Sequence, residues 1–331
     1  MVERRSTGKI RVAKALWYTA PGKVELRTAQ VPIPGPGHAQ VQTLFTGISR
    51  GTERLIFSGS VGESEWDRMR APLQEGNFPF PVKYGYCAVG CVVVGPDKLL
   101  NKNVFCLHPH QDVFNVEASR LTEVPAAVPA RRATLTANME TALNALWDAG
   151  AGPADKIVVV GGGIVGLLVA SISARLPGAD VTLVDVIDRS ALAQTLGASF
   201  VTPDKSPTNA DIVFHASASA KGLETAVGCA GFEGKIVELS WYGDKPVRVN
   251  LGGAFHSQRL QLISTQVGHV ATSRRVRWDY ARRLAAAMKL LEDPRLDALV
   301  SDEVAFADLP AKLADVFAGT SLAPVVTYPE G

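Results

Sequence analysis

The feature that most constrains this chain is a glycine cluster directly after a short apolar run. Residues 157–160 are Ile-Val-Val-Val, and Gly161, Gly163 and Gly166 then supply the spacing Gly-x-Gly-x-x-Gly. Between a buried strand and a helix, this spacing predicts a parallel-sheet domain that binds a dinucleotide. In order, the glycines permit a tight turn, the approach of backbone to a pyrophosphate and close packing of helix on strand. The helix N-terminus adds free N–H groups and positive potential.

A second apolar run, residues 181–184, ends in Asp185, about 20 residues beyond the glycine cluster. A carboxylate there accepts hydrogen bonds from ribose hydroxyls and repels a 2′-phosphate, which predicts a preference for NAD(H). Arg189 begins the next predicted helix and leaves NADP(H) open. Further ligand contacts are expected at the carboxyl ends of the later strands. The predicted cofactor-binding residues are Gly161, Gly163, Ile164, Val165, Gly166, Asp185, Val186, Arg189, Ala216, Ser217, Ser240 and Trp241.

The character of the chain changes near residue 130. Before it, short β-type segments separated by Gly and Pro predict a β-rich domain. These segments are 23–26, 39–45, 89–94 and 104–108. After it, a helical pattern over 131–149 leads into alternating strands and helices, which is typical of an α/β domain with a doubly wound parallel sheet.

The last part of the chain returns to a different pattern. Two amphipathic helices at 280–291 and 308–317 precede a short strand at 324–328. We expect this tail to rejoin the first domain. The predicted organisation is a β-rich domain at 1–134, a dinucleotide-binding domain at 135–272 and a return segment at 273–331.

Composition narrows the class of partner. The 331 residues carry a net charge of +2 with both signs interspersed, so we expect no nucleic-acid partner. No apolar stretch is long enough to cross a membrane, and no apolar run follows the basic residues of the N-terminal segment. The four cysteines are scattered and form no Cys-x-x-Cys pair, which indicates reduced thiols. We therefore expect a cytoplasmic protein with a small-molecule substrate.

Two further motifs carry a family resemblance. Residues 47–55 read Gly-Ile-Ser-Arg-Gly-Thr-Glu-Arg-Leu, and residues 85–90 read Gly-Tyr-Cys-Ala-Val-Gly. With the glycine cluster, they make the chain resemble a medium-chain dehydrogenase/reductase over nearly its whole length, and within that superfamily the bacteriochlorophyllide a dehydrogenase-like group. The resemblance implies a GroES-like β-rich catalytic domain, a Rossmann cofactor domain and a homodimer paired through residues 260–263.

The resemblance also implies that zinc is missing. Where the zinc alcohol dehydrogenases of the superfamily have three metal ligands, this chain matches with Ser49, Tyr86 and about Ala137. None of these is a good zinc ligand, and the cysteine-rich lobe of many relatives is absent, so we expect neither a catalytic nor a structural zinc. One alternative stays open, a metal held by Cys87, Cys106, His108 and His110.

Without zinc, the resemblance points to hydroxyl groups for catalysis. Tyr86 is the first candidate for stabilising charge on a substrate oxygen, with an aromatic pocket wall as the alternative. Thr52 matches a proton-relay hydroxyl, Glu53 an acid expected to orient Tyr86 or Arg50, and Arg50 a residue that contacts the pyrophosphate. We expect Cys87 to be a buried thiol.

Several positions outside these motifs complete the interpretation. Two placements stay open for His110, one over the substrate cleft and one, which we favour, in a surface loop. We expect His215 to lie in the core. Residues 61–80 should border the substrate cleft, with Arg68 and Arg70 in solvent.

The sequence thus favours a metal-independent NAD(H)-dependent dehydrogenase or reductase acting on an alcohol, ketone or conjugated carbonyl. Two alternatives stay open. One is an NADPH-dependent quinone or enone reductase. The other is a cofactor-binding regulatory or scaffold protein that has lost catalysis.

Overall fold

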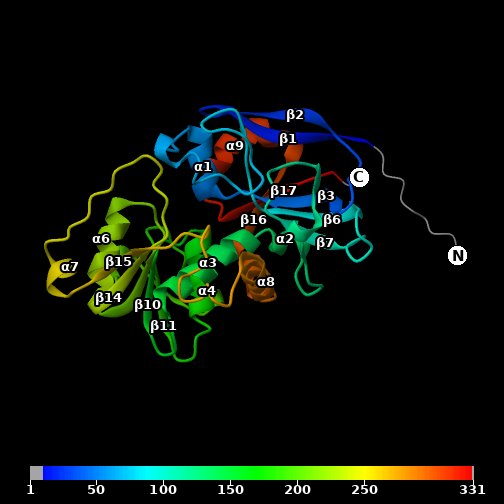
Figure 1. Ribbon diagram of the computed structural model, residues 1–331. Helices are drawn as coiled ribbons and strands as arrows, with labels where there is room; N and C mark the ends of the chain where they lie inside the picture. The colour runs from blue at the N-terminus through cyan, green and yellow to red at the C-terminus, as the bar shows by residue number, and fades with distance from the viewer. Residues whose placement is uncertain (1–9, 330–331) are drawn as a thin grey trace. The chain divides into compact units, whose positions relative to one another are not determined.

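The computed structural model describes residues 10–329, which divide into two compact units (Figure 1). Unit 1 contains the described residues up to Ala137 and those from Val300 onward, and unit 2 is Asn138–Leu299. No helix within residues 10–329 is long and apolar enough to cross a bilayer. The prediction about a targeting signal depends partly on residues 1–9, which lie outside the described residues.

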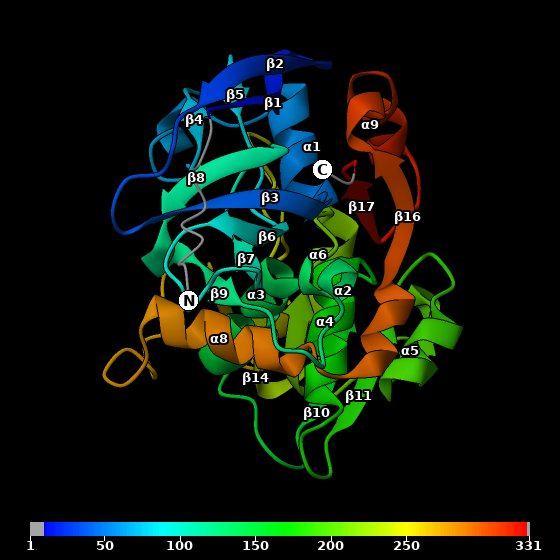
Figure 2. The same cartoon turned by 90° about the vertical axis from the view of Figure 1, so that its right-hand side faces the viewer.

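Unit 1 is built from two sheets. The seven-stranded sheet places β8 and β6 on either side of β3 (Figure 2). Its order is β16 (Val300–Ala305), β17 (Ala323–Thr327), β3 (His38–Gly47), β6 (Ala88–Val94), β7 (Asn103–Cys106) and β9 (Thr122–Glu123), with β8 (Val113–Glu117) also on β3. The four-stranded sheet is β2 (Lys23–Val31), β1 (Arg11–Ala20), β5 (Val82–Lys83) and β4 (Glu75–Gly76). The helices are α1 (Arg50–Ser58), α2 (Ala130–Ala133) and α9 (Leu309–Ala318).

Unit 2 contains a six-stranded sheet in which every pairing is parallel. The strand order is β12 (Ser199–Val201), β11 (Asp180–Val184), β10 (Lys156–Val160), β13 (Ala210–His215), β14 (Ala230–Glu238) and β15 (Gln261–Ser264). The helices are α3 (Thr136–Ala149, in unit 2 from Asn138), α4 (Ile164–Ser173), α5 (Ser190–Leu196), α6 (Ala220–Cys229), α7 (Ala254–Ser257) and α8 (Tyr280–Leu290).

The direction of chain progression reverses at β10. From β10 the chain passes through α4 to β11 on one side, and β13 follows on the other side and passes through α6 to β14. Right-handed crossovers in opposite directions put their helices on opposite faces of the sheet. Residues 157–160 are accordingly all buried, which explains their continuous apolar sequence. This arrangement leaves a crevice at the carboxyl ends of β10 and β13.

Two sequence predictions about elements need correction. The helix expected over 131–149 is two helices, because the Thr134 hydroxyl donates to the Arg131 carbonyl at 2.7 Å and that of Thr136 to the Ala133 carbonyl at 2.6 Å. Such local bonds compete with helical hydrogen bonding. Strand β1 was not among the predicted strands, although it pairs with β2 along nearly its whole length.

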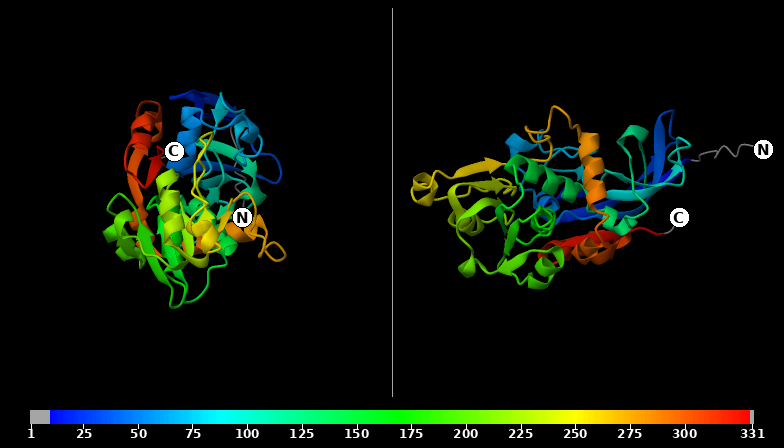
Figure 3. Two further views of the ribbon diagram at one scale, coloured as in Figure 1. Left: turned by 90° about the vertical axis from the view of Figure 1, so that its left-hand side faces the viewer. Right: turned by 90° about the horizontal axis from the view of Figure 1, so that it is seen from below.

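The predicted start of the return segment, residue 273, is too early in the chain. Residues 273–299 belong to unit 2, and the chain rejoins unit 1 only at Val300. The reason lies on α8, which is orange in Figure 3. Its Arg283 is buried and donates to Glu140 at 2.9 Å and Asn144 at 2.6 Å, both on α3. A buried guanidinium needs such partners, so α8 stays with the unit that supplies them.

Candidate functional site

The glycine turn of unit 2 is shaped by the packing of its own backbone. Gly161 has φ +110°, and a Cβ there would lie 2.6 Å from the Ser217 backbone nitrogen. A Cβ at Gly166 would overlap the Gly161 carbonyl oxygen. At Gly163, by contrast, a Cβ would meet no atom within 4 Å. Two glycines are therefore required by the fold itself, and the third faces open space at the start of α4.

Asp185 closes the turn from the end of β11. Its carboxylate accepts the Gly162 N–H with one oxygen and the Ile187 N–H, at 2.7 Å, with the other. Arg189, which precedes α5, lies beside it, because its Cγ would be 3.0 Å from a Cβ at Gly162. The Arg189 Nε is buried and has no hydrogen-bond partner among residues 10–329. A carboxylate and a guanidinium therefore both border the glycine turn.

The remaining predicted cofactor residues also lie at this edge of the sheet. Ile164 and Val165 form the first turn of α4, where backbone N–H groups lack helical partners. Val186 follows Asp185 and is 83% exposed. Ala216 and Ser217 follow β13, and the Ala216 N–H donates to the Val160 carbonyl at 2.8 Å. Ser240 and the half-buried Trp241 follow β14.

In unit 1, the candidate catalytic residues gather around a buried carboxylate. Glu53 lies in the first turn of α1 and is only 1% exposed. It accepts hydrogen bonds from the Tyr18 hydroxyl at 2.8 Å, the Ser49 backbone N–H at 2.8 Å and His110 Nε2 at 2.9 Å. Burial and the Glu53 carboxylate raise the pKa of Tyr18. Three donors thus compensate for removing Glu53 from water.

His110 corrects the expectation of a surface histidine. Its side chain is buried, and its Nδ1 lies 2.6 Å from the Thr46 hydroxyl, which in turn lies 3.1 Å from that of Tyr328. Gly85 lets the ring approach, because a Cβ there would be 3.0 Å from His110 Cδ2. The surface-loop prediction was wrong because the sequence does not reveal these distant partners.

Tyr86 contacts the Glu53 network through Ser49 and adds a further hydroxyl group beside it. Its phenol donates to Ser49 Oγ at 2.6 Å. Burial raises the pKa of Tyr86 well above the ordinary value, the Cys87 and Glu53 charges add to this, and hydrogen bonds with Ser49 and Thr52 partly oppose it. The phenol is therefore a neutral donor at physiological pH. The structure brings together the hydroxyl groups of Ser49, Thr52 and Tyr86, whose catalytic roles stay a prediction.

Two predicted roles are contradicted by the observed partners. The side chain of Glu53 makes no direct hydrogen bond to that of Tyr86 or Arg50; it holds Tyr18 and His110 instead. Arg50 donates to carbonyls at the end of α9, including that of Val316 at 3.0 Å. A cation that binds the free carbonyls of a helix C-terminus is stabilised there. Arg50 thus anchors α9, and its guanidinium is not free to hold a pyrophosphate.

The alternative metal site is also contradicted. The His108 ring stacks on Phe114 with centroids 3.7 Å apart, and burial lowers its pKa to about 3. Burial raises the pKa of Cys106 to about 12 and also raises the pKa of Cys87, so both thiols are protonated near neutral pH. Among residues 10–329, no three His, Cys, Asp or Glu side chains form a group able to hold a metal ion.

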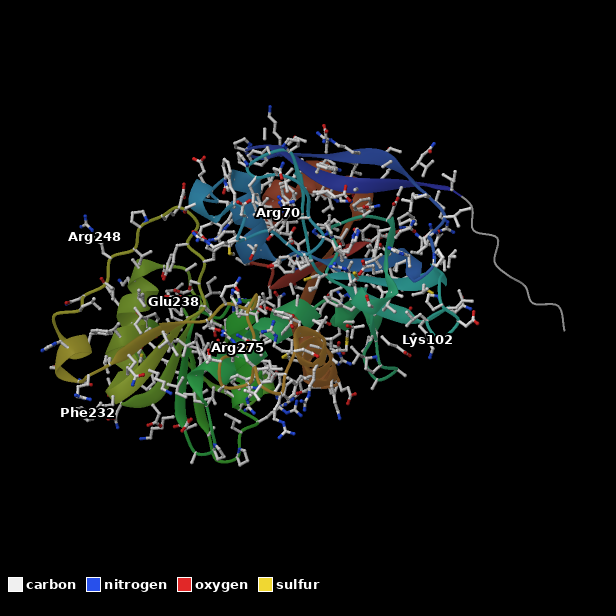
Figure 4. The ribbon with its side chains drawn as sticks, viewed as in Figure 1. Arg70, Lys102, Phe232, Glu238, Arg248 and Arg275 are labelled. Atoms are coloured by element: carbon white, nitrogen blue, oxygen red, sulfur yellow. The ribbon has the colours of Figure 1, made fainter. Side chains whose placement is uncertain are left out.

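In the loop at residues 61–80, the arginine side chains have their partners within the loop itself. Arg68 pairs with Glu65 at 2.6 Å, and Arg70, labelled in Figure 4, donates to Asn77 at 2.9 Å. Trp66 donates to the Val61 carbonyl at 3.0 Å. These contacts fit the expectation that the two arginines are exposed loop residues.

Sequence reasoning missed several members of the Glu53 network, namely Tyr18, Thr46 and Tyr328. They lie in or beside β strands, in stretches without a motif. Thr46 is one of several polar residues of β3, so the sequence does not single it out. Only the structure shows that its hydroxyl is fully buried and therefore requires a partner.

Comparison with known proteins agrees with this architecture. No family model matches the chain. An uncharacterised zinc-type alcohol dehydrogenase-like protein of Haemophilus influenzae is 30% identical over 155 residues, covering 43% of this chain and 45% of that protein. The 2-dehydro-3-deoxy-L-galactonate 5-dehydrogenase of Pseudoalteromonas atlantica is 25% identical over 218 residues, covering 62% and 60%. The chain thus spans about half the length of the curated relatives it matches.

Solved structures match over almost the whole chain. L-Idonate 5-dehydrogenase from Escherichia coli has a TM-score of 0.79 at 15% identity, covering 96% of this chain and 99% of that one. An alcohol dehydrogenase from E. coli CFT073, complexed with NADH, has a TM-score of 0.76 at 16% identity with the same coverage. A dehydrogenase from Sinorhizobium meliloti bound to NADP has a TM-score of 0.75 at 16% identity, covering 96% and 99%.

The fold is therefore a GroES-like β-rich unit combined with a Rossmann unit, as the sequence predicted. Over part of its sequence the chain is similar to alcohol dehydrogenase-like proteins, and over almost its whole length its fold is similar to that of solved dehydrogenases. Its place in the medium-chain dehydrogenase/reductase superfamily stays a prediction. The narrower resemblance to the bacteriochlorophyllide a dehydrogenase-like group stays a prediction.

Proposed function

We propose that this protein is a metal-independent, NAD(H)-dependent oxidoreductase acting on an alcohol, a ketone or a conjugated carbonyl. The observation that carries the proposal is the 2.6 Å hydrogen bond from Tyr86 to Ser49, above the buried Glu53, in a chain that also has a Rossmann glycine turn. The cytoplasmic location stays a prediction.

The glycine turn fits a dinucleotide. The open space at Gly163 leaves room for a pyrophosphate against the first N–H groups of α4. Each oxygen of Asp185 accepts one backbone N–H and keeps a lone pair for a ribose hydroxyl. The bound nicotinamide would accept or supply hydride. The protein holds the cofactor, stabilises negative charge on the substrate oxygen and transfers a proton to or from that oxygen.

Tyr86 is the residue that we assign to the substrate oxygen. During reduction its phenol donates a hydrogen bond to the carbonyl oxygen, on which negative charge develops. A full alkoxide is about as basic as hydroxide, so even a phenol of raised pKa can give up its proton to it. The hydroxyls of Ser49 and Thr52 hydrogen-bond Tyr86 and can return the proton. Oxidation of an alcohol uses the same path in reverse.

The donor set supports the proposal of metal independence. Zinc in proteins is bound by thiolate, imidazole and carboxylate groups. The positions that the family resemblance matches to zinc ligands are a serine hydroxyl at Ser49 and a phenol at Tyr86. Burial keeps this phenol protonated. A neutral hydroxyl and a neutral phenol are poor zinc ligands, and they are effective hydrogen-bond donors.

One observation favours a second candidate, an NADPH-dependent quinone or enone reductase. The buried Nε of Arg189 lacks a hydrogen-bond partner among the described residues and lies beside Asp185. A guanidinium at this edge of the turn could bind a 2′-phosphate. The Asp185 carboxylate opposes this by charge repulsion, so we place NAD(H) first.

Cofactor titration tests these proposals. Protein dialysed against a chelator and checked for metal content would be titrated with NADH and NADPH, following nicotinamide fluorescence. We expect NADH to bind more tightly than NADPH. Asp185→Ala should reduce the ratio of the two affinities about five- to thirtyfold, which corresponds to a loss of about 1–2 kcal/mol in the difference between their binding free energies. Tighter binding of NADPH would favour the second candidate. Stoichiometric zinc after dialysis would contradict metal independence, and binding without turnover of any carbonyl would support a regulatory protein.

We also propose a homodimer formed through β15. This strand is an edge of the six-stranded sheet, and Leu262 on it is 38% exposed. An unpaired edge strand with an apolar side chain is a template for pairing with a second copy. Light scattering should give twice the mass of one chain, and Leu262→Asp should shift the population toward monomer. A monomeric wild-type protein would contradict the proposal.

A further inference from the structure

A buried chain of polar side chains crosses the second half of the Rossmann sheet. His215, the last residue of β13, is fully buried. Its Nδ1 lies 2.8 Å from Glu238 Oε2 at the end of β14, and its Nε2 lies 2.7 Å from Ser217 Oγ. Figure 4 shows Glu238 at the opposite end of β14 from Phe232. These hydrogen-bonded side chains therefore lie at the carboxyl edge of the sheet. The prediction that His215 is a core residue did not include these partners.

Glu238 is held as a carboxylate. It accepts the Ser240 backbone N–H at 2.8 Å and the Tyr242 hydroxyl at 3.1 Å, besides His215. Burial tends to raise the pKa of Glu238, but its hydrogen bonds with His215 and Ser240 outweigh this and lower the pKa below its usual value. An ionised carboxylate only accepts hydrogen bonds. Nδ1 of His215 therefore carries a hydrogen and donates it to Glu238.

This tautomer determines the direction of the next hydrogen bond. In a neutral imidazole with Nδ1–H, the other nitrogen is an acceptor. Ser217 then donates its hydroxyl hydrogen to Nε2, and its oxygen has two lone pairs for other donors. The Ser219 hydroxyl, 3.1 Å away, can use one of them and leaves the other for a ligand. Gly222 of α6 leaves the hydroxyl little room, because a Cβ there would overlap Ser217 Oγ. The hydroxyl is thus held in one orientation.

Ser217 also lies beside the cofactor turn. Its backbone nitrogen would be 2.6 Å from a Cβ on Gly161, and its side chain is half-buried. The sheet order reverses between β10 and β13, which places both residues at the crevice where Rossmann domains bind dinucleotides. Asp185 belongs to the first half of the sheet and Ser217 to the second, so the two residues face different halves of a dinucleotide.

We infer that His215, held by Glu238, makes the Ser217 hydroxyl a dedicated hydrogen-bond acceptor for a donor in the nicotinamide half of the cofactor. The donor chemistry is an O–H or N–H group, supplied either by the nicotinamide ribose or by the carboxamide. Of these three residues, only Ser217 touches the cofactor. His215 and Glu238 are positioning residues. The inference rests on the proposed function, because it requires that a nicotinamide dinucleotide binds.

Binding of three ligands to Ser217→Ala tests the inference. NADH carries both donor groups, ADP-ribose carries the terminal ribose without the carboxamide, and ADP carries neither. Affinities would be measured by calorimetry on the full chain, with Ser199→Ala, an exposed serine on β12, as the matched control. We expect Ser217→Ala to weaken NADH about tenfold, the value of one hydrogen bond, and to leave ADP unchanged.

The pattern of losses identifies the donor and separates the two proposals. Weakening of NADH and ADP-ribose assigns the ribose, and weakening of NADH alone assigns the carboxamide. Equal weakening of ADP, or no weakening at all, overturns the inference while the wild-type protein still binds NADH. If the wild-type protein binds neither NADH nor NADPH, the proposed function fails and the inference fails with it.

A second variant, at His215, tests the positioning role without changing Ser217. His215→Phe removes the acceptor that orients Ser217, so it should weaken NADH and spare ADP in the same way. Because both residues act through one hydrogen bond, the double variant should lose no more affinity than the larger single loss. Fully additive losses would contradict the positioning role.

Discussion

The two candidate sites of this molecule are built in opposite ways. In unit 2, the glycine turn takes its shape from backbone and from the absence of side chains, within residues 161–166. In unit 1, side chains from separate parts of the chain converge on one carboxylate, Glu53. The first kind of site follows from a short stretch of sequence. The second exists only when distant segments are folded together.

The difference also concerns what each site contributes to stability. Removing a partner of Glu53 leaves buried polar groups without hydrogen bonds, so the Glu53 network, for which we propose a catalytic role, is also part of the core of unit 1. Gly163 faces open space, so a small side chain there would affect a ligand and not the fold. Substitutions should therefore separate stability from binding in unit 2 and couple stability to activity in unit 1.

The largest expected effect is that of Glu53→Ala. It leaves the donors of Tyr18, Ser49 and His110 unpaired in the core, which should lower the free energy of unfolding by about 3–5 kcal/mol. Urea unfolding measures the loss. Glu25→Ala, which removes an exposed pair with Arg27, is the control and should cost less than about 1 kcal/mol. A loss for Glu53→Ala no larger than that of the control would show that the network does not stabilise unit 1.

Tyr86→Phe should come next, with its effect on turnover. Loss of the phenol removes the proposed donor to the substrate oxygen and should lower kcat about 10²- to 10³-fold on a carbonyl or alcohol substrate. The control is Tyr84→Phe, whose ring lies 6.0 Å from that of Tyr86. It should retain most of the turnover. Equal activity of Tyr86→Phe and the wild type would mean that the phenol is only a pocket wall.

Gly163→Ala should have the smallest effect, confined to the cofactor. The added methyl group meets no protein atom within 4 Å, so the melting temperature should not change. It intrudes where the pyrophosphate is expected and should weaken NADH about tenfold or more. Gly228→Ala on α6 also points into open space and should leave NADH affinity intact. Unchanged affinity in Gly163→Ala would place the cofactor elsewhere.

Much of unit 2 could be predicted from the sequence. The strands at residues 157–160 and 181–184, the glycine turn and Asp185 all lie where the pattern indicated. Each depends on neighbours within a few residues, such as the close approach of Gly166 to Gly161. The segment from 273 to 299 could not be assigned, because Arg283 finds its partners on α3, far away in the sequence.

In unit 1, the sequence identified some residues and mistook their partners. Glu53, Arg50 and His110 were all recognised as notable, yet their contacts differ from those expected. Arg50 binds carbonyls at the end of α9, which are more than 260 positions away in the chain. A side chain's hydrogen-bond partner depends on which strand ends meet, and no local spacing encodes that.

The sequence by itself determined the glycine turn after β10 and identified Ser49 and Tyr86 as the hydroxyl residues that the family resemblance matches to zinc ligands. These follow from residue identity and short spacing, since a glycine or a serine has the same steric and chemical limits in any fold. Only the tertiary structure decided that the buried Glu53 and the half-buried Glu238 are acceptors, and hence in which direction the neighbouring hydroxyl groups donate. Burial makes each unpaired polar group costly, so the direction of a hydrogen bond is settled only when every neighbour is in place.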